Sequence, residues 1–243
     1  MSLKSFLAHL KKHITFILVG IIAILVMEYF GFFLGISNYC YDAFFRLRGP
    51  VPPPQSIVLL AVDEKTLDQL GRWPLQRRYY ARLFDRLSAA RAVGLDILMI
   101  EPSADDSLLS DALVARHRIV FPSYISKGVR IVPSLSMFNP QSTGHIHLEQ
   151  DIDGVVRKVY HTLYHGDRKL VSFTSLLFEK LTDQSFPRER FDGRGEGLSG
   201  GQSNIIQMDM RAINYYGPQG TFPIFSFSDV VGDKYDAAFF KDK

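Results

Sequence analysis

The sequence has little cysteine, because Cys40 is the only one among 243 residues. A disulfide within the chain is therefore excluded, so a domain exported to an oxidising compartment has to be held together by its apolar core. An excess of basic residues is also missing, since 28 lysines and arginines stand against 25 aspartates and glutamates. Nucleic-acid-binding chains more often carry a basic stripe, and we therefore expect no nucleic-acid partner.

Charge is nearly absent from residues 14–37, where Glu28 is the only formally charged side chain. A helix of roughly 20 apolar residues is long enough to cross a bilayer. A cleaved signal peptide would have a shorter apolar core, of about 7 to 15 residues, followed by a small-residue cleavage site. The sequence therefore predicts an uncleaved transmembrane signal anchor over 14–37, in preference to a buried helix of a soluble domain.

The orientation of this span follows from its flanks. Lys4, Lys11 and Lys12 precede it, and the positive-inside tendency keeps such a segment in the cytoplasm. Arg46 and Arg48 beyond the span weaken the asymmetry without reversing it. We expect residues 1–13 to be cytoplasmic and residues 38–243 to lie outside the cytoplasm.

Apolar runs and helical spacing predict a strand–helix–strand unit after the span. A continuous apolar strand over 57–62 ends in Asp63 and Glu64, and a second one over 94–100 ends in Glu101. Between them, apolar residues recur at helical spacing in the run "RRYYARLFDRLSAARA". Such a unit places its two strands side by side and parallel, with a right-handed crossover.

The parallel arrangement predicts a ligand site at one edge of the sheet. The carboxyl ends of both strands would meet there, and ligands of open α/β sheets bind outside that edge. The segment "LGRWPLQR" leaves the first strand on the same side and brings an aromatic side chain and a guanidinium towards the acids. The predicted ligand-binding residues are Asp63, Trp73, Arg77, Asp96 and Glu101.

A purely structural interpretation of the same residues stays open. In it, Arg77 neutralises Asp63 or Asp96, and Trp73 covers the core. Asp96 lies inside an apolar run and needs a partner if it is buried. The neighbouring Asp105 and Asp106 are favoured as the N-cap and first-turn acids of a following helix.

The remaining segments continue the alternation of strands and helices that is typical of an α/β layer. We expect a helix over "DSLLSDALVARH", a strand at 119–121, a hairpin around a turn at Asp153–Gly154, a helix over 171–181, a Gly-rich loop over 187–201 and a strand in "SNIIQMDMRAINYYGP". The predicted fold class is α/β, with a mixed, largely parallel sheet flanked by helices and preceded by one N-terminal transmembrane helix.

Other motifs do not reach the specificity that a catalytic or metal site requires. The run 195–200 matches GxGxxG without a strand before it, and "DIDG" has Thr162 where a calcium loop needs a bidentate Glu. His145 and His147 would share a strand face, but no third ligand is placed beside them. We therefore predict no catalytic residue, no metal and no cofactor.

Six segments, taken in order, resemble one known family, the CHASE2 domains. They are "YDAFFRLRG", "IVLLAVDEKTLDQLGRWP", "GLDILMIEPSADDSLL", "DIDGVVRKV", "INYYGPQGTFPIFSFSDVV" and "FFKDK". CHASE2 domains are extracytoplasmic sensor modules of bacterial transmembrane receptors. The family pattern is closer to "WPWPR" where this chain has "WPLQR", and it continues beyond the position of Lys243. We therefore expect this chain to be a fragment of a longer receptor.

The resemblance implies a function. We expect an input domain over 38–243, in the periplasm and anchored in the bacterial inner membrane, that detects a small-molecule or other periplasmic stimulus. It would act as a homodimer and signal through membrane helices to a cytoplasmic adenylate or other nucleotide cyclase, a diguanylate cyclase or a histidine kinase. The chain itself would not be an enzyme. Two alternatives remain: a metal-dependent periplasmic hydrolase using Asp63, Glu64 and Glu101, and a structural or dimerising module.

Overall fold

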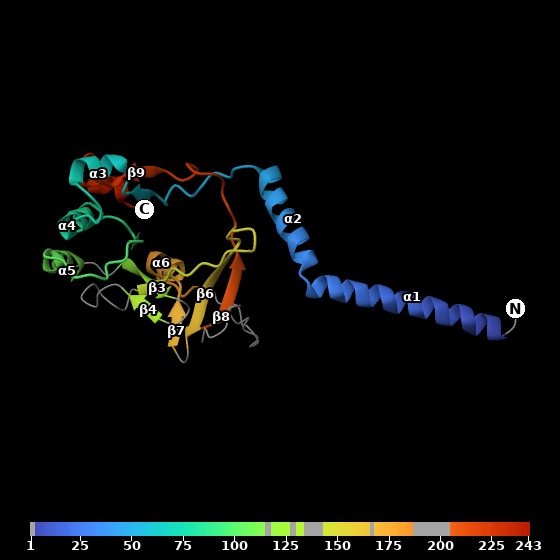
Figure 1. The fold of residues 1–243 in the computed structure, drawn as a ribbon. Helices are drawn as coiled ribbons and strands as arrows, with labels where there is room; N and C mark the ends of the chain where they lie inside the picture. Colours follow the sequence, from blue (N-terminus) through green and yellow to red (C-terminus); the bar gives the residue numbers. More distant parts are fainter. Residues whose placement is uncertain (1–2, 115–117, 127–129, 134–142, 166–167, 187–204) are drawn as a thin grey trace. The chain divides into compact units, whose positions relative to one another are not determined.

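The computed structural model describes residues 3–114, 118–126, 130–133, 143–165, 168–186 and 205–243. The chain divides into two compact units (Figure 1). Unit 1 comprises residues 1–52 and 215–221, and unit 2 comprises residues 53–214 and 222–243.

Unit 1 contains two helices, α1 (Leu3–Tyr29) and α2 (Phe32–Arg48). They are separated at Gly31, whose φ of 72° lies in the left-handed region that a residue without a Cβ adopts readily. The stretch that is long and apolar enough to cross a membrane is Lys11–Tyr29, and none of its apolar window is buried. At a rise of about 1.5 Å per residue it is about 28 Å long, which matches the hydrocarbon core of a bilayer.

The end of α2 is held by residues that come from much later in the chain. The helix stops at Gly49, directly before the proline-rich run. The Arg48 guanidinium donates to the carbonyl of Tyr215, and the Val51 N–H donates to the carbonyl of Tyr216 at 2.7 Å. The rings of Phe45 and Tyr215 also meet edge to face. The segment 215–221 is therefore part of the same compact unit as α2.

Unit 2 is a mixed α/β arrangement with small parallel and antiparallel sheets. A two-stranded parallel sheet pairs β1 with β9, and a second sheet has the order β2-β3-β4, with β5 also pairing with β3. A third, antiparallel sheet has the order β7-β6-β8. The strands are β1 (Leu59–Ala61), β2 (Val93–Gly94), β3 (Ile119–Ser126), β4 (Arg130–Pro133), β5 (Thr143–His145), β6 (Lys158–His165), β7 (Arg168–Val171), β8 (Ile205–Ala212) and β9 (Ile224–Ser226).

Helices pack against these sheets, and α6 lies beside β3 and β5 (Figure 1). The apolar positions of α4 are buried at the spacing of one helix face, which explains why this segment is helical. The helices of unit 2 are α3 (Glu64–Leu70), α4 (Arg77–Arg86), α5 (Asp106–Val114), α6 (Phe173–Thr182), α7 (Phe227–Val231) and the 3-10 helix η3 (Ala237–Phe240).

The predicted α/β class, with helices around a mixed set of strands and an apolar N-terminal helix, is confirmed. The helix after Glu101, the strand at 119–121 and the helix over 171–181 are confirmed as α5, β3 and α6. The strand expected after the Gly-rich loop is β8. The loop itself, 187–201, falls outside the described residues.

The predicted pairing of the first two strands was wrong. The first strand, β1, pairs with β9 from the far end of the chain, and the second, β2, pairs with β3. Regular strand structure also stops at Gly94, and Leu95 adds one further hydrogen bond to Val120. A local strand–helix–strand pattern could not reveal β9, because that partner lies more than 160 residues away along the chain.

The predicted hairpin was also wrong, although its turn is present. Within it, the N–H of Gly154 donates to the carbonyl of Asp151, and Gly154 has a φ of 79°. However, β5 before the turn pairs in parallel with β3, while β6 after it pairs with β7 and β8. The turn thus connects two different sheets.

Candidate functional site

Asp63 is the N-cap of α3 and the centre of a polar network. One carboxylate oxygen accepts from the Thr66 N–H at 2.9 Å, from the Thr66 hydroxyl at 2.7 Å and from the Ser226 hydroxyl at 2.8 Å. The hydrogen bond from the Thr66 hydroxyl is the main reason that the pKa of Asp63 is lowered. The Thr66 oxygen in turn accepts from the N–H of Ser228. Asp63 therefore ties α3 to β9 and α7.

Arg77 is buried and makes an ion pair with a buried carboxylate. Its Nε lies 3.1 Å from Oδ1 of Asp106, and its terminal nitrogen donates to the main-chain carbonyl of Glu101 at 3.1 Å. The other oxygen of Asp106 accepts from the N–H of Ser103. The pair holds the start of α4 against the start of α5. The structural interpretation named Asp63 or Asp96 as the partner of Arg77, and both assignments were wrong.

Three of the predicted ligand-binding side chains are exposed to solvent: Trp73, Asp96 and Glu101. Trp73 is 53% exposed and does not cover the core, whereas Leu75, two residues later, is buried in it. Asp96 is exposed and needs no buried partner. Among the described residues, the hydrogen bonds of Asp63 and Arg77 go to groups other than these side chains. A ligand crevice formed by all five residues stays a prediction.

The acids of the "DIDG" turn bind the buried guanidinium of Arg157. Arg157 is 4% exposed, and its guanidinium donates to Asp151 at 2.7 Å and to both carboxylate oxygens of Asp153 at 2.7 and 2.9 Å. These hydrogen bonds are the main reason that the pKa of Asp153 is lowered to about 2. The guanidinium holds the carboxylates that a calcium loop would offer to its ion. The spacing of Arg157 from the two acids was the signal that the sequence analysis missed.

Three histidines of unit 2 form what we call the histidine cluster: His145, His147 and His161. His145 is 2% exposed, and neither of its ring nitrogens has a hydrogen-bond partner among the residues that the structure describes. Burial, and to a smaller extent the neighbouring His147 and His161, lower its pKa to about 3. Sequence reasoning paired His145 with His147 but could not place His161, which comes from β6. In the described part of the chain, no three His, Cys, Asp or Glu side chains are grouped as a metal site.

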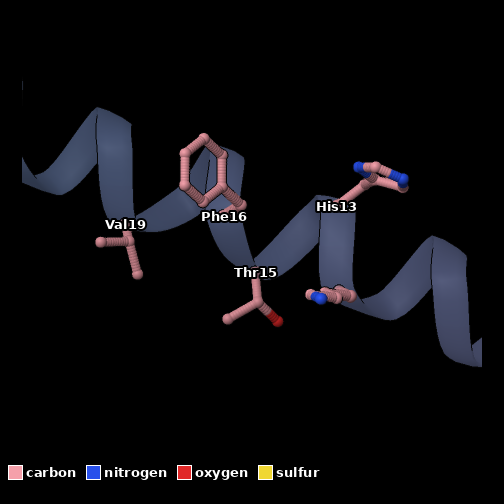
Figure 2. Close-up of a pocket in the computed structure, with 5 residues that line it drawn as sticks. His13, Thr15, Phe16 and Val19 are labelled. Carbon is pink, nitrogen blue, oxygen red and sulfur yellow. The ribbon is translucent and has the colours of Figure 1, made fainter.

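A hollow on α1 is lined by side chains of that single helix. Figure 2 shows Val19, Phe16, Thr15 and His13 projecting from the ribbon; Lys12 is the fifth lining residue. Phe16 is 80% exposed, as expected for a side chain that faces lipid acyl chains rather than a protein core. The hollow is therefore part of the apolar surface of the candidate span.

Comparison with known families gives one match, and it covers nearly the whole chain. The model of the CHASE2 domain matches residues 16–243, which include most of the candidate span and all of unit 2. No curated protein and no solved structure matches the chain. Because the match extends over far more than half of the sequence, the chain belongs to the CHASE2 family, an extracellular sensor module of signalling receptors.

Proposed function

We propose that this chain is the input domain of a bacterial transmembrane receptor that detects a periplasmic stimulus and controls a cytoplasmic output. The observation that carries the proposal is the family match, which runs without interruption from the apolar helix through the α/β unit. The output would be a nucleotide cyclase, a diguanylate cyclase or a kinase on a continuation of the polypeptide. CHASE2 domains are typically non-catalytic, and we propose that this chain has no turnover of its own.

The proposed topology rests on α1. Its side chains between Lys11 and Tyr29 are exposed and mostly apolar, and its lysines lie before this stretch or in its first two positions. We propose a cytoplasmic segment over 1–13, a signal anchor over 14–37 and a periplasmic domain over 38–243. The break at Gly31 would then lie within the anchor and allow α2 to leave the bilayer at an angle to α1.

The connection between the units supports a route for the signal. The segment 215–221, which grips the end of α2, lies between β8 and β9 in the sequence. The chain therefore passes between the units on both sides of this segment, as well as after residue 52. A displacement of β8 or β9 would pull on the segment that contacts Arg48 and Val51. A stimulus shifts such an element only by stabilising one arrangement more than the other.

We propose that the predicted ligand site contributes in two ways. Trp73, Asp96 and Glu101 are exposed, so one aromatic face and two carboxylates are accessible to a ligand. Asp63 and Arg77 have internal partners and would act by holding α3 and α4 in place. The residues thus divide into three that would touch the ligand and two that would position the elements carrying them.

The output of a full-length receptor tests the proposed function. With this chain as its input domain, we expect Trp73→Ala and Glu101→Gln to abolish the response to stimulus at unchanged protein level in the membrane. Arg78→Ala is the matched control, because Arg78 adjoins the same segment but is exposed and bonds only locally to Gln76. A receptor whose output ignores deletion of residues 53–243 would contradict the sensor function itself.

A further inference from the structure

The histidine cluster lies where two sheets of unit 2 meet. His145 at the end of β5 forms an isolated parallel bridge with Ser172. The N–H of Ser172 donates to the carbonyl of His161 at 2.9 Å, which extends by one residue the register that pairs Thr162 with Val171. Residues directly opposite one another in a sheet project to the same face. His145, Ser172 and His161 therefore form a row across the junction, and His147 follows two residues after His145.

The first turn of α6 covers this row. Ser172 is the N-cap of α6, and its hydroxyl donates to the hydroxyl of Ser175, which lies 2.9 Å from Nδ1 of His161. The fit is tight, since a Cβ added to Gly144 would lie 2.6 Å from the main-chain nitrogen of Phe173. The positive end of the helix dipole lies at this turn, and it disfavours a second positive charge.

Within the described residues, His145 has no hydrogen-bonding partner to stabilise a charged ring. Both of its nitrogens are buried and unpaired, and His147 has one buried unpaired nitrogen as well. An unpaired buried polar group costs free energy, and a buried unpaired charge costs much more. The β5–α6 contact is therefore compatible with a neutral imidazole at residue 145 and incompatible with an imidazolium.

The charged groups on the segment of His145 and on β6 do not offset this cost. Glu149 raises the pKa of His147, although burial outweighs it and the net pKa of His147 is lowered. Glu149 also accepts from the Tyr160 hydroxyl at 2.6 Å. His161 from β6 is itself an imidazole and disfavours a second charge on His145.

Among the described residues, no carboxylate on the elements packed against β5 contributes to the pKa shift of His145. On α6, Glu179 and Lys180 lie in the later turns, where Glu179 accepts from the N–H of Phe186. Arg168 and Lys169 of β7 and Tyr124 of β3 are exposed. Beyond His161, the ring of Phe186 stacks on the imidazole of His161. The guanidinium of Arg211 lies over the Phe186 ring, 5.4 Å from its centre. Apart from Glu179, the groups named on these elements carry positive charge or none.

We propose that acid opens the contact between β5 and the first turn of α6 by protonating the histidine cluster, and that external acidification is a stimulus this domain detects. The second half of this inference rests on the proposed sensor function. The first half is a property of this chain alone. It uses the two unpaired nitrogens of His145, the imidazoles beside it and the helix N-terminus above it.

The sign and size of the effect follow from linkage. The pKa of His145 is about 3 in the closed contact and 6.5 in an exposed imidazole. Above pH 6.5 both states are neutral and the contact has its full stability, and this stability is lost progressively as the pH falls from 6.5 towards 3. Between pH 7.5 and pH 5.0 the open state gains about 30-fold relative to the closed one.

Hydrogen exchange on the full chain in detergent micelles tests the inference. After correction for intrinsic exchange rates, we expect opening of peptides over 143–147 and 172–177 to rise about 30-fold from pH 7.5 to pH 5.0. Peptides from the β6–β8 ladder serve as the internal reference and should change much less. In His145→Gln, which keeps a polar side chain of similar size without the titration, the acid effect should be lost.

Equal protection at both pH values, or the same acid opening in His145→Gln, would overturn the inference. If His145→Gln does not fold, the ring signals of the wild-type chain followed by NMR decide the matter, since a His145 that titrates near 6.5 contradicts a closed neutral contact. If the chain opens in acid through His145 while a receptor that carries it responds to no stimulus, the inference that acid opens this contact still holds. That outcome would contradict only the sensor function.

Discussion

Two regions of unit 2 treat their buried polar groups in opposite ways. At the α3–α4 side, the Asp63 carboxylate accepts three hydrogen bonds. The charges of Arg77 and Asp106 neutralise one another there. At the β5–α6 junction, both ring nitrogens of His145 are buried and have no hydrogen-bond partner in the described part of the chain. A satisfied network fixes one arrangement, whereas an unsatisfied titratable group makes the stability of its surroundings depend on conditions. The comparison indicates which part of the domain is rigid and which part can respond.

The largest effect should come from breaking the Arg77–Asp106 pair. Arg77→Ala leaves Asp106 as a buried carboxylate without its counter-charge, and we expect a loss of about 3–5 kcal/mol of unfolding free energy. Trp73, the only tryptophan, lies four residues away and provides the fluorescence signal for the unfolding transition. Arg78→Ala is the control and should change the stability little. Equal stabilities of the two variants would mean that the buried pair does not hold α4 to α5.

Acid should have the next largest effect, and at the other region. Because the folded pKa of His145 is lowered to about 3, folding should lose about 2 kcal/mol between pH 7.5 and pH 5 from this group. The melting temperature of the full chain should fall by about 4–8 °C on this account. Measured by circular dichroism, the difference between wild type and His145→Gln should appear below pH 6.5 only. Parallel pH profiles would show that His145 does not control this region.

A smaller effect is expected at the cap of α3. Asp63→Ala removes the acceptor for the Thr66 N–H and the Ser226 hydroxyl, and a lost N-cap costs about 0.5–2 kcal/mol. The contribution of the carboxylate should be present above its usual pKa and be lost as the pH falls through its lowered value. Asp68→Ala, in the same helix and exposed, is the matched control. Thermal unfolding of both variants distinguishes a cap from a generic surface acid.

The smallest effect on the fold is expected from replacing Cys40, the only cysteine, which can test the proposed homodimer by disulfide cross-linking. Cys40 is exposed on α2, so mild oxidation of membranes should join two copies of the chain through it if α2 lines a two-fold interface. Cys40→Ser should abolish the cross-link without changing the melting temperature. A chain that stays monomeric on non-reducing gels at all oxidant levels would argue against α2 as that interface.

The sequence predicted what depends on local patterns. The helix face of α4, the buried run of β3 and the turn at Gly154 all follow from spacing, apolar content or backbone conformation within a few residues. The candidate site depended on long-range pairing and was harder to predict. Asp106 is the first-turn acid of α5 that the sequence predicted, but nothing local identifies Arg77 as its partner. His161 is brought to His145, and Ser226 to Asp63, by pairing between strands that are distant in the chain.

Fusions after Lys243 test the central claim, an extracytoplasmic sensor domain, most directly. With the full chain in front, alkaline phosphatase should be active and green fluorescent protein should be dark, because the lysines in the N-terminal part of α1 keep the N-terminus in the cytoplasm. A variant with Lys11 and Lys12 replaced by glutamate should weaken this bias. A fluorescent fusion with inactive phosphatase would place unit 2 in the cytoplasm and contradict the account.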